Sequence, residues 1–542
     1  MRDRTDSADT FAQIECWMQA CVQTHQKCNP PRATGSSVPS RLVRVEEEGK
    51  TFRLVTDAPQ DTRYLTLSYR WGSTTQSYML TEQTQAHLLA GLPTAVLPKT
   101  LQDACCIATR LGFRYLWVDR LCILQDSRED WSFEASKMAE VYRNSFCTIS
   151  ASGSFDEDGG CFRSRMAFGI QPMSLCNILL LRGRTYYFSD APQNEQKEGK
   201  FGHLSDRGWV FQERAMSCRI LHFGDEQVHW ECAEAQFNET WPWGEPDFVT
   251  GAASVQSVRP SLSCISMFRT DLSGIWTSVV EEYSRTKLTY ESDKLPALAG
   301  LANEVALFGK DEYLAGLWRR NLLAGLCWRS IYENPQAPKQ YRAPSWSWPS
   351  LDAPVTYGGE YARITWRGER HLASVKDVVV TYADTNAFGS VTGGWVILFG
   401  NLIPVLIKPM REGRSIPAGL HYKAFQMDGT RFPGLGGRYD VAAAALDIDF
   451  SILAGGTIRT YCVPLVERNT SVKGEGSTYC LLLAPKGAVP SLKIGTGLAG
   501  SLSSNGEEYQ RIGLIWLYSN HWGEFREWLS EEAPPKQDIV IR

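Results

Sequence analysis

A short stretch of the chain, RGWVFQERAMS (207–217), places an acid among large apolar side chains. Asp206 is a good N-cap candidate just before it, so we expect a helix to begin there. An ionised carboxylate is costly to bury without a partner. Glu213 is therefore expected either to pair with Arg207 or to line a pocket. The spacing i, i+3, i+4 and i+7 puts four residues on one helix face: Trp209, Gln212, Glu213 and Met216.

Polar and aromatic side chains also follow two apolar runs that are typical of buried strands, YLTLSY (64–69) and RYLWVD (114–119). In an open parallel sheet, ligands bind beyond the carboxyl ends of the strands. Each residue has an ordinary alternative: Asp119 as a turn cap, Trp71 as core, Arg70 in a surface ion pair. The predicted substrate-binding residues are Ser68, Tyr69, Arg70, Trp71, Asp119, Gln125, Trp209 and Gln212.

Two thiols and an imidazole, from Cys21, His25 and Cys28, fall on one face of an amphipathic helix predicted over 9–28. Such groups bind zinc, but structural zinc normally takes four ligands from paired short spacings, which this segment lacks. The same positions also continue an apolar stripe. Core packing is therefore favoured over a metal site, and no metal ligand is predicted.

Strands and helices alternate in the first half of the chain, which predicts a parallel sheet with helices on both faces. A pair of short strands is expected before this alternation, at 41–47 and 51–56. The expected strands that follow are 64–69, 114–119, 146–152 and a pair within 219–232 around Gly224, and the expected helices are 98–112 and 127–144. A hairpin is expected at 178–189.

The predicted organisation has five parts. A helix and strand pair occupies 1–59, the α/β domain 60–240, a linker rich in Pro, Gly, Trp and Ser 241–263, a helical region 264–340 and a β-rich region 341–542. Helical segments are expected at 274–286, 294–309 and 313–330.

The composition is that of an ordinary globular protein, with 43% hydrophobic and 21% charged residues among 542. The net charge of −4 gives no support for nucleic-acid binding. We expect no membrane span and no secretory signal, and hence a cytoplasmic protein with mostly reduced cysteines. Walker A, GxSxG and HExxH motifs are absent, as is a GxGxxG that follows a strand.

Several long motifs in order resemble the fungal heterokaryon-incompatibility (HET) domain. They are YLTLSYRWG, LPKTLQDACCIATRLGFRYLWVDRLCILQDS, MAEVYRNSFCTISAS and RGWVFQERAMSCRILHF with HWEC. They cover about residues 60 to 240. The segments WMQACVQTHQKC and RAPSWSW resemble flanking features of large HET-domain proteins, which extends the likeness to about residue 350.

The resemblance implies a flavodoxin-like α/β fold related to TIR domains, and a role in nonself recognition that triggers regulated cell death. Relatedness to TIR enzymes implies NAD as a substrate, with cleavage at the nicotinamide–ribose bond and no other cofactor. The WVFQE motif then maps the catalytic role onto Glu213, and LSYRWG resembles the first-strand signature that bounds the nucleotide site.

Two positions depart from the family pattern beside the expected pocket: Arg120 replaces a small residue and Leu124 a polar one. Two other functions therefore stay open. One is a non-enzymatic module that signals by self-association or through an incompatibility partner protein. The other is an enzyme of secondary metabolism that reuses the fold.

Overall fold

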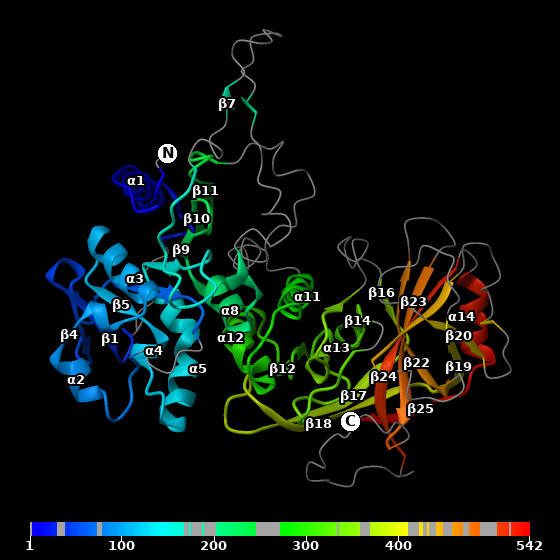
Figure 1. Ribbon diagram of the computed structural model, residues 1–542. Coiled ribbons are helices and arrows are strands. Elements are labelled where there is room, and N and C mark those ends of the chain that lie inside the picture. The colour runs from blue at the N-terminus through cyan, green and yellow to red at the C-terminus, as the bar shows by residue number, and fades with distance from the viewer. Residues whose placement is uncertain are drawn as a thin grey trace. The chain divides into compact units, whose positions relative to one another are not determined.

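The computed structural model divides the chain into two compact units, Met1–Ser266 and Met267–Arg542, which are described separately (Figure 1). The described residues are 3–29, 38–72, 78–166, 173–174, 187–188, 202–244, 272–332, 335–357, 369–409, 422–426, 431–432, 441–447, 458–469, 476–487, 507–519 and 522–542. Most of the expected linker and of the expected hairpin at 178–189 lies outside them.

A nine-stranded sheet of order β11-β10-β9-β6-β3-β5-β1-β2-β4 forms the centre of the first unit. Its central strands run parallel: β3 (Leu65–Ser68), β5 (Tyr115–Trp117), β6 (Cys147–Ser150) and β9 (Arg219–Phe223). These four strands are numbered 1 to 4 along the chain. Across the sheet, from β5 through β3 and β6 to β9, their order is 2-1-3-4, which is the order of flavodoxin-like sheets. The expected α/β fold is confirmed.

Antiparallel strands extend this sheet at both sides of the expected parallel strands. β1 (Leu42–Glu46), β2 (Thr51–Val55) and β4 (Leu92–Pro93) continue it beyond β5. β10 (Val228–Cys232) and β11 (Gln236–Asn238) continue it beyond β9. The connections within these groups are mostly too short for the crossover that parallel pairing requires.

In the described part of the first unit, four helices of at least two turns pack on this sheet: α1 (Ala8–Thr24), α3 (Lys99–Arg110), α5 (Arg128–Asn144) and α8 (Gly208–Met216). α1 lies beside α3, and the Arg110 guanidinium of α3 stacks 3.4 Å from the centre of the Phe11 ring of α1. α5 lies beside α8, where Trp131 and Trp209 meet edge to face. Right-handed crossovers place α3 and the α5–α8 pair on opposite faces.

Two predicted helix boundaries are wrong. α1 ends at Thr24 rather than at Cys28, since His25 adopts an extended backbone, and the Asn29 side chain donates to the Cys21 and His25 carbonyl oxygens. α8 is preceded by Arg207, which makes no side-chain cap, whereas Asp206 ends a 3-10 turn. A short helix, α2 (Gln85–Ala90), was not expected.

The second unit begins with two helices, α11 (Leu272–Tyr283) and α12 (Ala299–Gly309), as expected. The helix expected at 313–330 is wrong over most of its length, since only α13 (Leu322–Gly325) is helical there. The first part of this range forms the two-stranded hairpin of β12 (Tyr313–Leu314) and β13 (Leu317–Trp318). Its turn places Ala315 and Gly316 at positive φ, which no α-helix accommodates.

The remainder of the second unit is β-rich, as expected. Hydrogen-bonded neighbours close six antiparallel strands into a ring: β19 (Ile403–Pro409), β20 (Tyr422–Gln426), β21 (Val441–Leu446), β24 (Glu508–Ser519), β23 (Gly476–Pro485) and β22 (Ile458–Asn469). Buried aliphatic residues form its core together with Phe525 of α14 (Trp522–Glu531).

Four further strands flank this ring. β25 (Lys536–Ile541), β18 (Val391–Asn401) and β17 (Ser374–Tyr382) extend it from β24, and β16 (Glu369–His371) pairs with β22. Within the described parts of the chain, no helix is long and apolar enough to cross a membrane.

Candidate functional site

Glu213 lies on the face of α8 that packs against the sheet, and only 8% of the residue is exposed. The hydroxyl of Ser68, at the carboxyl end of β3, donates to Oε2 of Glu213 at 2.5 Å. From β3 the chain passes to β5 on one side and then to β6 on the other, so the strand order reverses between β3 and β6. Ligands of open α/β sheets bind at such a switch point. The structure thus brings Ser68 and Glu213 together at the expected edge.

Hydroxyl groups surround the inner end of this pair. Thr66 and Thr148 lie 2.7 Å apart through their hydroxyl oxygens, and Thr148 lies 2.6 Å from the Ser217 hydroxyl. Ser217 donates in turn to the carbonyl oxygen of Glu213. The cavity beside Ser68 measures about 20 Å³, which holds about one water molecule. Its lining includes Ser68, Thr148 and His222 but not Glu213.

The pKa of Glu213 is raised to about 7, mainly by burial and in part by the charge of Asp119. The hydrogen bond from Ser68 and the positive charge of Arg207 act in the opposite direction. A carboxyl group with a pKa near neutral pH can both give and accept a proton, which is the property required of a general acid or base.

Neither basic residue near Glu213 forms an ion pair with it among the residues described here. Arg207 donates from Nη1 to the carbonyl oxygen of Tyr69 at 2.8 Å. Arg214 turns away from Glu213, as expected, and its Nη2 lies 2.9 Å from Oε1 of the buried Glu231. The Glu213 carboxylate accepts a hydrogen bond from Ser68, and the charge of Arg207 also favours its ionised form.

Asp119 forms a second polar group at the carboxyl end of β5, where it begins the short helix α4 (Asp119–Cys122). The indole nitrogen of Trp71 donates to Oδ2 at 2.8 Å, and the backbone nitrogen of Arg120 donates to Oδ1 at 2.7 Å. Burial raises the pKa of Asp119, and burial also raises that of the Tyr69 hydroxyl beside it. Tyr69, Trp71 and Asp119 thus lie together.

Arg120, one of the two departures from the family pattern, is buried beneath Trp71. Its Nη1 lies 2.7 Å from Oε2 of Glu157, and both side chains are almost fully buried. The guanidinium carbon lies 4.5 Å from the centre of the Trp71 ring. Arg120 therefore helps to fix Trp71 from below while Asp119 holds its indole nitrogen.

The other predicted binding residues take different positions. Arg70 is exposed, and the Gln125 amide donates to the carbonyl oxygens of Asp119 and Ile123, so that it braces its own loop. Trp209 is half-buried against Trp131, with ring centres 6.3 Å apart. Gln212 is buried beside Glu213 on α8. None of these contacts requires a ligand.

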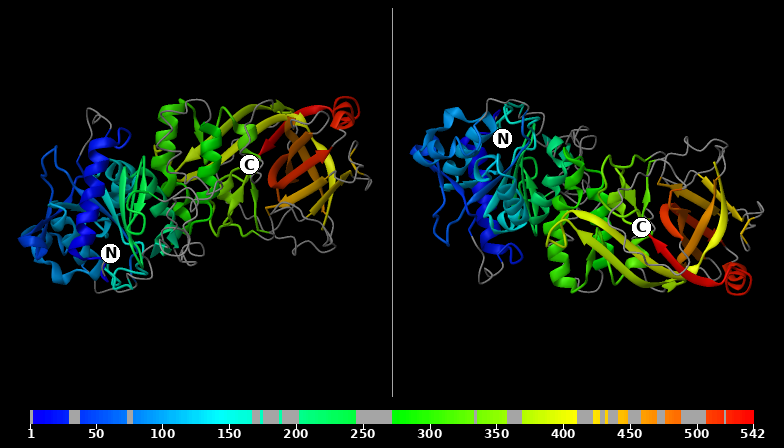
Figure 2. Two further views of the ribbon diagram at one scale, coloured as in Figure 1. Left: turned by 90° about the horizontal axis from the view of Figure 1, so that it is seen from above. Right: turned by 90° about the horizontal axis from the view of Figure 1, so that it is seen from below.

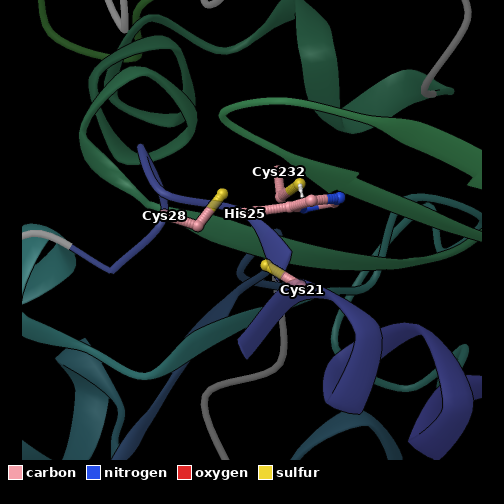
Figure 3. A group of neighbouring side chains, drawn as sticks. All are labelled: Cys21, His25, Cys28 and Cys232. Carbon is pink, nitrogen blue, oxygen red and sulfur yellow. Dashed lines mark hydrogen bonds between the residues drawn. The ribbon is translucent and has the colours of Figure 1, made fainter. Parts of the chain in front are cut away.

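A separate group gathers sulfur and nitrogen atoms on the α1 side of the sheet. Cys21, His25, Cys28 and Cys232 each offer one ligand atom, and these atoms all lie within 4.8 Å of one another (Figure 3). Hydrogen bonding to the Cys232 sulfur is the largest cause of a raised pKa at Cys21. The sequence did not predict Cys232 here, because it lies far along the chain, at the end of the second strand of a hairpin.

Comparison with known proteins bears on the segment that contains Ser68, Asp119 and Glu213. Searches of curated proteins and of solved structures gave no significant match. Residues 64–213, from the start of β3 to Glu213 itself, match the family model described as "Heterokaryon incompatibility protein (HET)". This segment is therefore similar to heterokaryon incompatibility domains, and the match covers less than half of the chain.

Proposed function

We propose that this protein acts in heterokaryon incompatibility as a nonself-recognition factor, and that it triggers regulated cell death by cleaving NAD between nicotinamide and ribose. The observation that carries the proposal is the buried Glu213 carboxyl group, which has a pKa of about 7 and meets Ser68 at the switch point of the sheet. Its position agrees with the catalytic role that TIR-related enzymes give to a helix glutamate.

The proposed reaction consumes NAD and water and yields nicotinamide and ADP-ribose. Water attacks the ribose carbon, the bond to the nicotinamide nitrogen breaks, and nicotinamide leaves with the bonding electrons while one proton is released. As in glycoside hydrolysis, the transition state has oxocarbenium character, which the Glu213 carboxylate would stabilise. The cavity of about 20 Å³ beside Ser68 suits the attacking water.

Access of the nicotinamide ring to Glu213 requires a conformational change, because only 8% of this residue is exposed. Closing and opening of the elements around a site commonly gate such reactions. In the proposal, an activating signal moves α8 away from the end of β3, so that Glu213 and Ser68 meet the ribose. The resting protein would then open only rarely and cleave NAD slowly, and the activating signal would raise the rate.

The test compares purified wild type, Glu213→Gln and a matched control, Glu226→Gln, whose side chain is exposed. We expect wild type to convert NAD to nicotinamide, and Glu213→Gln to be slower by at least about 100-fold, the usual loss when one group that stabilises transition-state charge is removed. Glu226→Gln should match wild type in a chromatographic assay of nicotinamide. Equal rates for the first two proteins, or no conversion by either on expression in cells, would contradict the proposal.

A second candidate function, signalling by self-association, is favoured by two exposed apolar side chains on α5. Trp131 is 41% exposed and Phe133 is 52% exposed, although large apolar residues are usually covered. If Phe133 joins copies of the chain, Phe133→Ser should abolish both self-association in light scattering and toxicity, while Glu213→Gln stays toxic. The reverse pattern would support the enzymatic proposal instead.

A further inference from the structure

Three of the four side chains in the sulfur-rich group come from the end of α1 and the turn after it. Cys21 lies in the last turn of α1, His25 follows the helix end, and Cys28 lies in the next turn. Cys232 is the last residue of β10. The helix end is necessary for this arrangement, since it lets the chain fold back and bring Cys28 toward Cys21.

The spacing of the ligand atoms suits a tetrahedral zinc ion. Zinc–sulfur bonds of about 2.3 Å and zinc–nitrogen bonds of about 2.0 Å require ligand atoms about 3.5 to 3.8 Å apart. The four atoms here lie within 4.8 Å of one another, and Nδ1 of His25 lies 3.3 Å from Sγ of Cys232. Small side-chain rotations are enough to close the shell around an ion.

We propose that Cys21, His25, Cys28 and Cys232 bind one structural Zn²⁺ ion, which fastens α1 to the β10–β11 hairpin. Four protein ligands complete the coordination of zinc and leave no open position for a substrate. The combination of three thiolates and one imidazole also suits zinc better than the oxygen-seeking cations magnesium and calcium.

Two N–H groups are already directed at the sulfur atoms. Nε of Arg219 donates to Sγ of Cys21 at 3.2 Å, and the backbone nitrogen of Ala235 donates to Sγ of Cys232 at 3.3 Å. Donors of this kind stabilise thiolates and orient the ligands of a metal site. They would add little to a cluster of neutral thiols, since a thiol is a weak acceptor.

The charge of Arg219 supports the same assignment. Its side chain is buried, with the residue 6% exposed, and its nitrogen atoms donate to Cys21, to carbonyl oxygens of Cys28 and Phe146 and to Asn29. No carboxylate forms a salt bridge with Arg219 in the described part of the chain. A buried cation needs a compensating charge. Zn²⁺ with three thiolates and a neutral imidazole carries one negative charge, which supplies it.

The site joins elements that also meet through other contacts. The indole nitrogen of Trp17 on α1 donates to the carbonyl oxygen of Pro242, and its ring stacks on Phe237 of β11. Figure 2 shows α1, the dark blue helix, alongside the green hairpin of β10 and β11. The half-buried His25 gives the ion a path from solvent. Trp17 holds the middle of α1 against the hairpin, and zinc would hold the C-terminal end of α1 there.

The first experiment measures metals in the full-length chain, purified without chelators, by mass spectrometry. We expect about one zinc per wild-type chain, and a loss of at least about 10-fold in Cys232→Ser, because a structural site needs all four ligands. The matched control is Cys218→Ser. Cys218 lies close by, where its thiol donates to the Cys28 carbonyl oxygen at 3.2 Å, but it is outside the ligand set.

A second measurement on the wild type covers the case in which Cys232→Ser does not fold. Cobalt should replace zinc and give the visible and near-ultraviolet bands of tetrahedral cobalt bound to thiolates. Less than about one zinc per ten chains would overturn the proposal, since a structural site is filled. A disulfide among Cys21, Cys28 and Cys232, iron or copper in place of zinc, or equal zinc loss in Cys218→Ser would overturn it too.

Discussion

The carboxyl group of Glu213 keeps its proton to a higher pH in the folded chain than in the unfolded chain. Its pKa is about 7 when folded and 4.5 ordinarily, and burial is the largest cause. Between these values the unfolded state has released the proton and the folded state has not, so the free energy of unfolding falls as the pH rises. The free energy of unfolding decreases by a total on the order of 3 kcal/mol. This decrease begins near the unfolded pKa and ends near the folded pKa.

Subtracting the data for Glu213→Gln isolates this contribution, because Asp119 also has a raised pKa. We expect the stability difference, wild type minus Glu213→Gln, to be more favourable to wild type at about pH 5 than at about pH 8. Urea unfolding at both values provides the measurement. Glu226→Gln, at an exposed position, should show no such change. A difference that grows with pH would mean that the folded protein holds Glu213 ionised.

At the scale of elements, the sequence predicted the centre of the first unit well. The apolar runs that became β3, β5 and β6 are buried strands, and the N-cap of α5 is Ser127, whose hydroxyl accepts from the backbone nitrogen of Asp130. Local patterns are sufficient here, because a buried strand appears as a continuous apolar run and a helix start as a capping residue. The helix face of Glu213 was predicted for the same reason.

Features that depend on distant parts of the chain were not predicted. Cys232 reaches Cys21 through the pairing of β10 with β9 and the packing of α1, which no local spacing records. The buried pair of Arg120 with Glu157 likewise joins α4 to a loop after β6. Ala315 adopts positive φ only because the hairpin of β12 and β13 requires it. In each case tertiary contacts overrode the local pattern.

The ion pair of Arg120 with Glu157 should stabilise the contact between α4 and the loop after β6, beneath Trp71. Glu157→Gln leaves the buried guanidinium without its counter-charge, which we expect to cost about 3 to 5 kcal/mol of unfolding free energy. The double change Arg120→Met with Glu157→Leu should cost less than this single change, because no charge stays buried. Urea unfolding of the three proteins measures both effects.

An exposed ion pair provides the control for that comparison. Lys376 and Asp538 have side chains that are 48% and 53% exposed, and Lys376→Met should cost less than about 1 kcal/mol. If Glu157→Gln is no more destabilising than Lys376→Met, the guanidinium of Arg120 does not need Glu157 as its counter-charge.

At the scale of the whole molecule, β10 carries two adjacent residues whose roles lie on opposite faces of the sheet. Glu231 pairs with Arg214 of α8 on the side of Glu213, whereas Cys232 belongs to the proposed zinc site on the side of α1. Neighbouring strand residues point to opposite faces, so one strand connects both sites. Loss of zinc should therefore weaken the first unit as a whole, including the packing of α8.

The two units have separate cores, and we expect them to respond differently to loss of zinc. A chelator should lower the unfolding temperature of the first unit by several degrees and leave that of the second unchanged, because the four proposed ligands all lie in Met1–Ser266. Differential scanning calorimetry of the full chain, with residues 272–542 expressed alone to assign its transition, makes the measurement. Cys232→Ser should reproduce the effect without chelator, and Cys218→Ser should not. A chelator shift carried by the transition of 272–542 would show that the ion holds a different part of the molecule.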